Sequence, residues 1–493
     1  MSKSRMWSRR TSAGLLASVM VVGAMTLAGG ATTASAVPLS EPSVLKDSPS
    51  DTLGPRDLEL LAEAKSKGEK NVMLLIATDK GESADVAAEL KKLGGKIAKR
   101  VDEIGYVRAS VPTSAVLAAA SVAGITAVDL DDTVQLPKPE PVPARASARA
   151  QATVAGPGPD TPAANPYMPT SEIGAVSFKE SHPTWDGRGV TIGIMDTGVD
   201  LDHPSLQTTS TGERKIVDWF TATDPIFDGD LTWRIMRDGV TGPSFSYAGA
   251  TWTAPAGAYK INRFSESITA ASSPAGDVNR DGDRTDQFGI LYDPATNNIR
   301  VDANQNRDFT DDPVMRPYAE RYDTGHFGTD NPGTAVREQM PFVVEFREDV
   351  DTTPANLPGT YDFVNIGIVE AAHGSHVAGI TAGNSLFGGS MSGAAPGAKL
   401  VSVRACLFVT GCTDHALVEG MIYAARDANV DVINMSIGGL PWVNDGNNAR
   451  AVIYNRLIDE FDVQMYISAG NEGAGMNTVG DPSVVDKVVS VGS

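Results

Sequence analysis

Residues Val190–His203 read V-T-I-G-I-M-D-T-G-V-D-L-D-H, an apolar run that ends in a carboxylate. The spacing of the apolar residues up to Met195 predicts a buried strand, and Gly198 predicts the turn that follows it. Asp196 would then lie at the carboxyl end of that strand, where the sites of open α/β sheets are found. An Asp in this position can also cap a turn or a helix, so the stretch predicts where a site would lie and leaves the role of Asp196 open.

Strand-like and helix-like runs alternate from residue 165 onward, apart from one long interruption. Strands separated by helices of this length need right-handed crossovers, which produce a parallel sheet with helices on both faces. We therefore expect a doubly wound α/β domain over residues 167–493. Further strands are expected at 399–403, 432–437, 463–469 and 487–491, and helices at 414–429 and 449–458.

Residues 71–130 form a separate predicted unit. Their apolar pattern gives the order βαββαβ, the split-βαβ plan of an α+β domain, which specifies no function by itself. Residues 133–166 are Pro, Ala, Gly and Thr with almost no large apolar side chains, so we expect an exposed linker that a protease can cut. A small folded unit, a cleavable linker and a larger domain together suggest a precursor.

The first 36 residues have the composition of a signal peptide. Basic residues between Lys3 and Arg10 precede an apolar stretch at 14–28, and Ala34-Ser35-Ala36 provides a cleavage site. We therefore expect a secreted, extracellular protein whose exported chain begins near Val37. No later segment is apolar enough over a sufficient length to predict a membrane span.

Length, charge and cysteine content set outer bounds on function. A chain of 493 residues is long enough for two to four domains. Its net charge of −20 argues against nucleic acid and anionic membrane surfaces as partners, since both require an excess of Lys and Arg. In an exported protein, Cys406 and Cys412 would either form a small disulfide loop or remain as two reduced thiols.

Two further polar residues lie at positions comparable to that of Asp196. His373 begins a helix-like run of small residues, and Asn471 follows the strand-like run at 463–469. A carboxylate that orients an imidazole, an imidazole that acts as general base and an amide that stabilises an oxyanion are the groups that acyl transfer needs. The pair His373 and His376 does not match a zinc helix, because the spacing is wrong and no Glu lies between them.

Five motifs resemble those of the subtilisin-type serine proteases, the S8 family. They are I-M-D-T-G-V-D at 194–200, H-G-S-H-V-A-G at 373–379, G-A-A-P-G-A-K-L at 393–400, V-I-N-M-S-I-G-G at 432–439 and S-A-G-N-E-G at 468–473. The resemblance implies a subtilisin-like fold and a secreted peptidase that cleaves polypeptides through an Asp-His-Ser triad. By it, Asp196 orients His373, His373 acts as general base and then acid, and Asn471 donates to the oxyanion. Ser436, Ile437 and Gly438 would pair with the substrate backbone.

Two regions around this domain extend the resemblance. Residues 37–132, with their core at 71–130, are similar to the family's inhibitory propeptide, which implies an intramolecular inhibitor. The long interval between Asp196 and His373 is similar to that of the pyrolysin and tripeptidyl-peptidase II branch. We expect a mostly β insert at about 205–365 beside the active-site cleft. Whether the enzyme is an endopeptidase or releases tripeptides stays open.

The family's serine nucleophile has no recognisable counterpart in this sequence. In the family it lies in a G-T-S-M-A-like turn downstream of the oxyanion Asn, whereas Gly389-Ser390-Met391-Ser392 precedes the strand expected at 399–403. We therefore expect the front part of a longer protease, with the serine after Ser493 and negligible hydrolysis by these residues alone. The alternative is a calcium-dependent secreted binding protein on a catalytically inactive subtilisin-like fold.

The expected insert contains two loops in which Asp and Asn alternate with other residues. Calcium prefers six to eight oxygen ligands, and such alternation supplies them. Neither loop has a Glu at its twelfth position, so neither completes an EF-hand, and both would also suit solvated acidic turns. The candidate calcium ligands are Asp277, Asn279 and Asp281 in the first loop, and Asp302, Asn304, Asn306 and Asp308 in the second.

Overall fold

The computed structural model describes residues 52–135, 168–333, 337–355, 357–407, 411–439, 448–473, 475–476 and 478–492. All of these residues belong to the compact unit Lys46–Ser493. The signal peptide expected at 1–36 lies outside the described residues, as does the linker expected at 133–166 except for its first three residues. Within the described part of the chain, no helix combines the length and apolar character needed to cross a membrane.

The N-terminal unit is a four-stranded antiparallel sheet with helices on one face. The strands β1 (Asn71–Thr78), β2 (Lys96–Val101), β3 (Tyr106–Pro112) and β4 (Ile125–Leu130) have the spatial order β2-β3-β1-β4, and the helices are α1 (Pro55–Lys67), α2 (Ser83–Lys92) and α3 (Val116–Ala120). Alternation along β1 directs Leu74 and Ile76 into a core with the helices, while Leu75 and Ala77 join the core of the larger domain. The predicted βαββαβ order is confirmed, and α1 precedes it.

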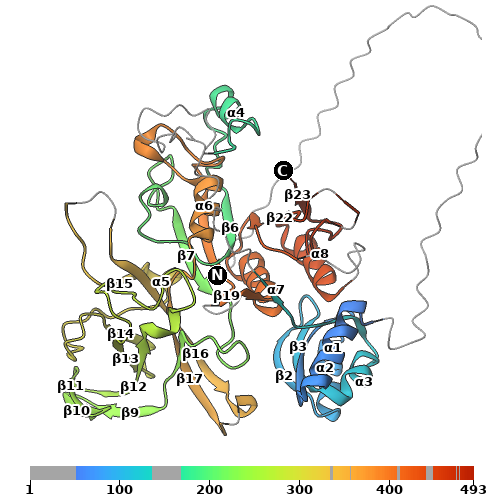
Figure 1. The fold of residues 1–493 in the computed structure, drawn as a ribbon, viewed down its shortest axis with the longest axis horizontal. Coiled ribbons are helices and arrows are strands. Elements are labelled where there is room, and N and C mark those ends of the chain that lie inside the picture. Colours follow the sequence, from blue (N-terminus) through green and yellow to red (C-terminus); the bar gives the residue numbers. More distant parts are fainter. Residues whose placement is uncertain are drawn as a thin grey trace, which may run out of the picture. The chain divides into compact units, whose positions relative to one another are not determined.

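The larger domain is built on a six-stranded parallel sheet (Figure 1). Its strands have the order β23-β22-β21-β6-β18-β7, which is the parallel, helix-connected arrangement that the sequence predicted. The strands are β6 (Thr191–Asp196), β7 (Ile216–Thr221), β18 (Lys399–Arg404), β21 (Val432–Met435), β22 (Gln464–Ser468) and β23 (Val489–Val491). Helix α4 (Ala175–Ser181) precedes β6.

Strand β6 carries a different set of helices on each of its faces. Ile192 and Ile194 pack in a core with α6 (His373–Ala382). Met195 packs in a second core with α7 (Asp414–Ile422), its π-helical continuation Tyr423–Asp427, and α8 (Ala449–Phe461). The doubly wound arrangement follows from this alternation, because each face of a buried parallel strand needs its own apolar cover.

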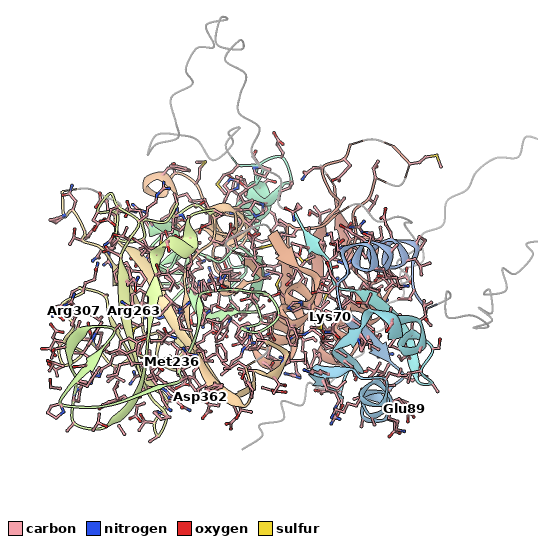
Figure 2. All side chains as sticks on the ribbon, turned by 60° about the horizontal axis from the view of Figure 1, so that its bottom comes forward. Lys70, Glu89, Met236, Arg263, Arg307 and Asp362 are labelled. Atoms are coloured by element: carbon pink, nitrogen blue, oxygen red, sulfur yellow. A yellow bond between two sulfur atoms is a disulfide. The ribbon has the colours of Figure 1, made fainter. Side chains whose placement is uncertain are left out.

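The insert between β7 and α6 is mostly β structure, as predicted. Since β7 belongs to the central sheet, the insert begins after Thr221 and not at about 205. Aromatic and aliphatic side chains, including Met236, fill the core between its sheets (Figure 2). The sheets have the orders β14-β13-β12-β9, β15-β16-β17-β8 and β10-β11. Their elements are β8 (Trp233–Ile235), β9 (Asp238–Thr241), β10 (Ser244–Tyr247), β11 (Ala250–Thr253), β12 (Ala258–Ser265), β13 (Gln287–Asp293), β14 (Asn298–Asp302), α5 (Tyr318–Arg321), β15 (Gly325–Phe327), β16 (Met340–Asp351) and β17 (Thr360–Gly367).

A small three-stranded sheet connects the N-terminal unit to the larger domain. It has the order β19-β20-β5, with β19 (Cys406–Leu407), β20 (Gly411–Thr413) and β5 (Thr133–Val134). Cys406 and Cys412 are directly opposite each other in β19 and β20 and are joined by a disulfide. The first residues of the segment predicted to be a linker therefore form a strand of this sheet.

Substitution of Ile433 in the centre of the parallel sheet should strongly destabilise the larger domain. Ile433 is fully buried on β21, so Ile433→Ala should lower the free energy of unfolding by about 2–5 kcal/mol. Val489→Ala on the edge strand β23, where the side chain is 40% exposed, should cost less than about 1 kcal/mol. Urea denaturation followed by tryptophan fluorescence measures both. Equal stabilities of the two variants would contradict this sheet order.

Candidate active site

Asp196 lies at the carboxyl end of β6 and is completely buried. The backbone N–H of Thr197 donates to its Oδ1 at 2.7 Å. Gly198 then turns the chain with a φ of 94°, and a Cβ at this position would lie 3.0 Å from the ring of Trp219. A glycine is therefore required where the backbone leaves the strand, and the turn fixes the direction of the carboxylate.

His373 is the first residue of α6, and its Nδ1 lies 2.8 Å from Oδ1 and 2.9 Å from Oδ2 of Asp196. The helix can come this close because its second residue is Gly374, where a Cβ would lie only 2.4 Å from the carbonyl oxygen of Gly198. The N–H of Gly374 also donates to Oγ1 of Thr197 at 2.9 Å. The side chain of His373 is 42% exposed, so the imidazole is held on one side by a buried carboxylate and is open on the other.

The electrostatic surroundings of His373 favour its protonated form. The hydrogen bond to Asp196 raises the pKa of His373 above its ordinary value against the effect of burial, and the negative charges of Asp196 and Glu370 raise it further. Burial raises the pKa of Glu370 itself to about 7, and its Oε2 is buried without a hydrogen-bond partner in the described structure. The sequence analysis missed Glu370, and its position three residues before His373 was the only available signal.

Five of the predicted site residues line one cavity of ≈ 570 Å³. His373 and Asn471 lie on it, together with Ser436, Ile437 and Gly438, which follow β21. Asn471 is exposed and follows β22, at the same edge of the sheet as Asp196. The structure therefore gathers an imidazole, a side-chain amide and residues 436–438 around a space large enough for part of a peptide.

The end of the N-terminal unit occupies a backbone edge at the same cavity. Strand β5 pairs antiparallel with β20, so that Val134 is opposite Cys412 and Thr133 is opposite Thr413. Val134 and the next residue, Gln135, line the cavity with His373. Residues 133–134 are thus bound in extended form by strand addition along β20. The sequence predicted such an edge only at residues 436–438, and not at β20.

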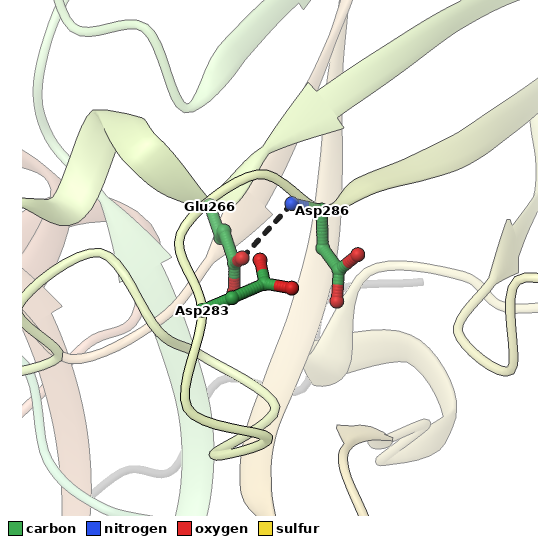
Figure 3. A group of neighbouring side chains, drawn as sticks. All are labelled: Glu266, Asp283 and Asp286. Atoms are coloured by element: carbon green, nitrogen blue, oxygen red, sulfur yellow. Dashed lines mark hydrogen bonds between the residues drawn. The ribbon is translucent and has the colours of Figure 1, made fainter.

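The first candidate metal loop precedes β13 of the insert and contacts a buried glutamate, Glu266. Carboxylate oxygens of Glu266, Asp283 and Asp286 lie within 4.8 Å of one another, and Figure 3 shows their side chains converging. Glu266 is fully buried and accepts hydrogen bonds from the N–H groups of Val278 and Asp286 at 3.0 and 2.9 Å. The sequence analysis missed Glu266, because it precedes the Asp/Asn run of this loop.

The predicted ligands of the first loop fold back onto its own backbone. Asp277 accepts from the N–H of Asp281 at 3.1 Å and from that of Gly282 at 3.1 Å. Asn279 accepts from Asp281 at 3.3 Å and donates to Asp286 at 2.5 Å. The oxygen-bearing side chains at 277, 279 and 281 therefore surround one short turn, as their alternation predicted.

The second loop repeats the first. Residues 280 and 282 have positive φ of 57° and 98°, and residues 305 and 307 have positive φ of 59° and 64°. Asp302 accepts from the N–H of Arg307 at 3.0 Å, as Asp277 does from Gly282, and Asn304 accepts from Asn306 at 3.1 Å. Asn306 accepts in turn from Asp308 at 2.8 Å. The side chains of Asp302, Asn304 and Asn306 therefore accept from the backbone of their own loop, while that of Asp308 accepts from Thr310 at 2.9 and 2.6 Å.

The second loop also holds buried carboxylate oxygens that lack a partner. Oδ1 of Asp302 and Oδ2 of Asp312 accept no hydrogen bond in the described structure, although these residues are only 1% and 6% exposed. Burial, together with the charges of Asp302 and Asp311, raises the pKa of Asp312 to about 7. Unpaired buried carboxylates are costly, so this loop is incomplete without a cation or a proton.

Comparisons with known proteins show the family of this chain. The family model described as the subtilase family matches residues 187–493, and that of a putative peptidase inhibitor domain matches residues 36–131. The chain is 27% identical over 483 residues to pyrolysin of Pyrococcus furiosus, covering 87% of this chain and 32% of pyrolysin. It is 27% identical over 392 residues to tripeptidyl-peptidase 2 of Arabidopsis thaliana, covering 66% of this chain and 27% of that protein.

Other similarities are shorter or more distant. Subtilisin E of Bacillus subtilis is 34% identical over 126 residues, which cover 25% of this chain and 31% of that protein. A crystal structure of tripeptidyl peptidase 2 aligns with a TM-score of 0.47 at 20% identity, covering 65% of this chain and 29% of the other. The chain spans about a third or less of the length of the curated relatives it matches, for example 32% of pyrolysin.

Replacement of Glu370 by Gln should lower the pKa of His373. The substitution keeps the shape of the side chain and removes a negative charge that favours the imidazolium. An NMR titration of His373 measures the shift directly, and in an active enzyme the acid limb of kcat/KM would move to lower pH, because the base acts in its neutral form. Glu103→Gln, an exposed change in the N-terminal unit, serves as control. An unchanged pKa of His373 in the Glu370 variant would contradict this electrostatic coupling.

Proposed function

Because this chain belongs to the subtilase family, we propose that it is a secreted serine peptidase whose site contains Asp196, His373 and Asn471. The observation that carries the proposal is the contact of 2.8 Å between Nδ1 of His373 and the buried carboxylate of Asp196. A buried carboxylate on Nδ1 leaves Nε2 free to take a proton, which is the arrangement of a general base. The expected signal peptide at 1–36 supports secretion.

Each of the three residues has a separate task in peptide hydrolysis. Asp196 holds the imidazole of His373 and stabilises its charged form. His373 removes the proton of a serine hydroxyl as that oxygen attacks the substrate carbonyl, and then delivers the proton to the leaving amine. Asn471 donates a side-chain N–H to the oxyanion that forms at the carbonyl oxygen. Residues 436–438 and β20 provide backbone that pairs with the extended substrate.

The proposal requires a serine nucleophile. The resemblance to the family places it after Asn471 in chain order, in a G-T-S-M-A-like turn that the 493 residues do not contain. Activity is therefore to be measured on a chain that contains both these residues and such a turn. A protein with an intact Asp196/His373 pair and no peptidase activity would leave the role of a secreted binding protein on an inactive fold.

We also propose that residues 37–132 act as an intramolecular inhibitor. Asp129 accepts hydrogen bonds from the N–H groups of Ala449 and Arg450, the first residues of α8, at 2.9 and 3.1 Å. Asp131 accepts from the N–H of His415 near the start of α7 at 3.0 Å. Two carboxylates thus cap two helices of the larger domain, where the helix dipole favours negative charge. The tail that follows leads along β20 into the cavity, where it would block substrate.

Calcium is the proposed cofactor of the two Asp/Asn loops. In the first loop Asp277, Asn279, Asp281 and Asp283 would hold it, with Asp286 and Glu266 adjacent. In the second, Asp302, Asn304, Asn306 and Asp308 would hold it, with Asp311 and Asp312 adjacent. The oxygen-only donor set and the unpartnered oxygens of Asp302 and Asp312 fit a hard divalent cation. A bound ion would supply the positive charge that these carboxylates lack.

Replacement of His373 by Ala should lower kcat/KM for peptide hydrolysis by about 10⁴- to 10⁶-fold, the range that loss of a triad member causes in subtilisin. His376→Ala is a matched control, because His376 is exposed on the same helix and does not contact Asp196 in the described structure. This control should retain activity. Peptide hydrolysis at the full rate by the His373 variant would rule out the proposed general base.

Removal of calcium should lower the melting temperature, and Asp302→Asn and Asp312→Asn should each weaken calcium binding measured by calorimetry. In the calcium-free protein, the raised pKa of Asp312 means that the stabilising contribution of its protonated form is fully present below pH about 4 and is lost as the pH rises through about 7, while Asp312→Asn should remove this part of the pH dependence. Asp238→Asn, an exposed change in the insert, is the control. A melting temperature that does not respond to calcium or chelator would overturn the calcium proposal.

A further inference from the structure

A buried arginine of the N-terminal unit contacts two other parts of the protein at once. Arg108 on β3 is 1% exposed. Its Nε lies 2.7 Å from Oε1 of Glu419 on α7, and its Nη2 lies 2.7 Å from Oδ2 of Asp224 in the insert. The guanidinium is also 5.4 Å from the ring centre of Phe227. The N-terminal unit, helix α7 of the larger domain and the insert therefore meet at one side chain.

A buried histidine of the larger domain makes a second contact of this kind. Nδ1 of His415 lies 2.7 Å from Asp131 of the N-terminal unit, and its Nε2 lies 2.9 Å from Asp228 of the insert. The side chain of His415 is 1% exposed. Although burial lowers the pKa of His415, the charges of Asp131 and Asp228 raise it to about 10, so that the imidazole is charged at neutral pH.

The carboxylates of the insert are fixed in place by their own turn. Asp224 accepts hydrogen bonds from the N–H groups of Ile226 and Phe227 at 2.7 and 3.1 Å. Oδ2 of Asp228 accepts from the N–H of Asp224 at 2.6 Å. The ion pair of Asp230 with the buried Arg404 at 2.8 Å anchors the end of the turn to the central sheet. The segment 222–230 is therefore a rigid acidic surface and not a loose loop.

Charges on the two sides of this contact are complementary. The larger domain contributes Asp224, Asp228 and Glu419, and nearby cations on that side are His415 and Arg347, which is 4.0 Å from Asp224. The N-terminal unit contributes Arg108 and also Lys99, which is 3.6 Å from Glu419. Without Arg108 the carboxylates of Glu419 and Asp224 would share a buried site with too little positive charge.

We propose that segment 222–230 of the insert, together with Glu419 and His415 of α7, is a recognition surface for the N-terminal unit, with Arg108 and Asp131 as its anchors. The insert, which lies outside the peptide-cleaving residues, thereby determines how tightly this unit is held. Its regulatory consequence rests on the proposed inhibitory function of residues 37–132. An N-terminal unit with the same fold but without a cation at position 108 would not be retained on this surface.

Hydrogen–deuterium exchange on the intact natural chain tests the proposal, because exchange at β5 and at the start of α8 reports release of the N-terminal unit. Arg108→Met should increase exchange at both places by at least about tenfold, because it leaves Glu419 and Asp224 buried without their cation. Asp224→Asn should also increase it, to a smaller extent. In the double variant Arg108→Met/Asp224→Asn, the fold increase in exchange should be smaller than the product of the two single increases, because the two residues interact directly. Arg100→Met, on the neighbouring strand with a side chain 42% exposed, should change nothing.

Exchange within β1 separates release from unfolding. If Arg108→Met also increases exchange within β1, the N-terminal unit has unfolded and that variant does not report its release. The test then rests on Asp224→Asn, since Asp224 lies outside the N-terminal unit. Unchanged exchange at β5 in Asp224→Asn, with an increase in Glu419→Gln, would overturn the role of the insert. The exchange measurement does not depend on peptidase activity, so a protein that fails to cleave peptides would refute the proposed function without affecting this result.

Discussion

The contact between His373 and Asp196 is the constraint on which the rest of the structure depends. It requires the start of α6 to lie against the end of β6 with almost no space between them, and Gly198 and Gly374 provide that space. The chain leaves the central sheet after β7 to form the insert, and it must then return to the end of β6. The return is visible in the hydrogen bond of 2.8 Å from the N–H of Glu370 to the carbonyl of Thr197, next to Asp196. The C-terminal end of the large β subdomain is thereby fixed beside Asp196, while its N-terminal end continues from β7.

The pairing of buried charges is a second constraint on the structure. With a net charge of −20, this chain places many carboxylates where they need partners, and two solutions are found. Helix starts receive Asp129 and Asp131, whose charges suit the helix dipole. Buried arginines such as Arg108 and Arg404 pair with carboxylates from distant segments. The loop at 302–312 has neither, which distinguishes it from the paired clusters and suits it to a cation.

Much of the candidate site could be predicted because its signals are local. A strand that ends in Asp196, a small-residue helix that begins at His373 and a turn at Asn471 each have a pattern within a few residues, as do the alternating oxygens of the two loops. Glu370, Glu266 and the edge of β20 were missed, because each acquires its role from a neighbour that is distant in sequence or that carries no motif. The boundary of the insert was placed too early for the same reason. Strand β7 is part of the central sheet only through its pairing with β18.

The sequence by itself determined the doubly wound sheet, the split-βαβ unit before it and the positions of Asp196 and His373 at the ends of their elements, because alternating apolar patterns and glycine-dependent turns are read over short distances. Only the tertiary structure decided which segments are in contact with one another. It brought the tail of the N-terminal unit along β20 to the cavity of His373, joined Cys406 to Cys412 and enclosed Arg108 between Glu419 and Asp224. Apart from the disulfide, these contacts join segments far apart in the chain, and their energies depend on burial and on the distance between charges, neither of which a linear pattern specifies.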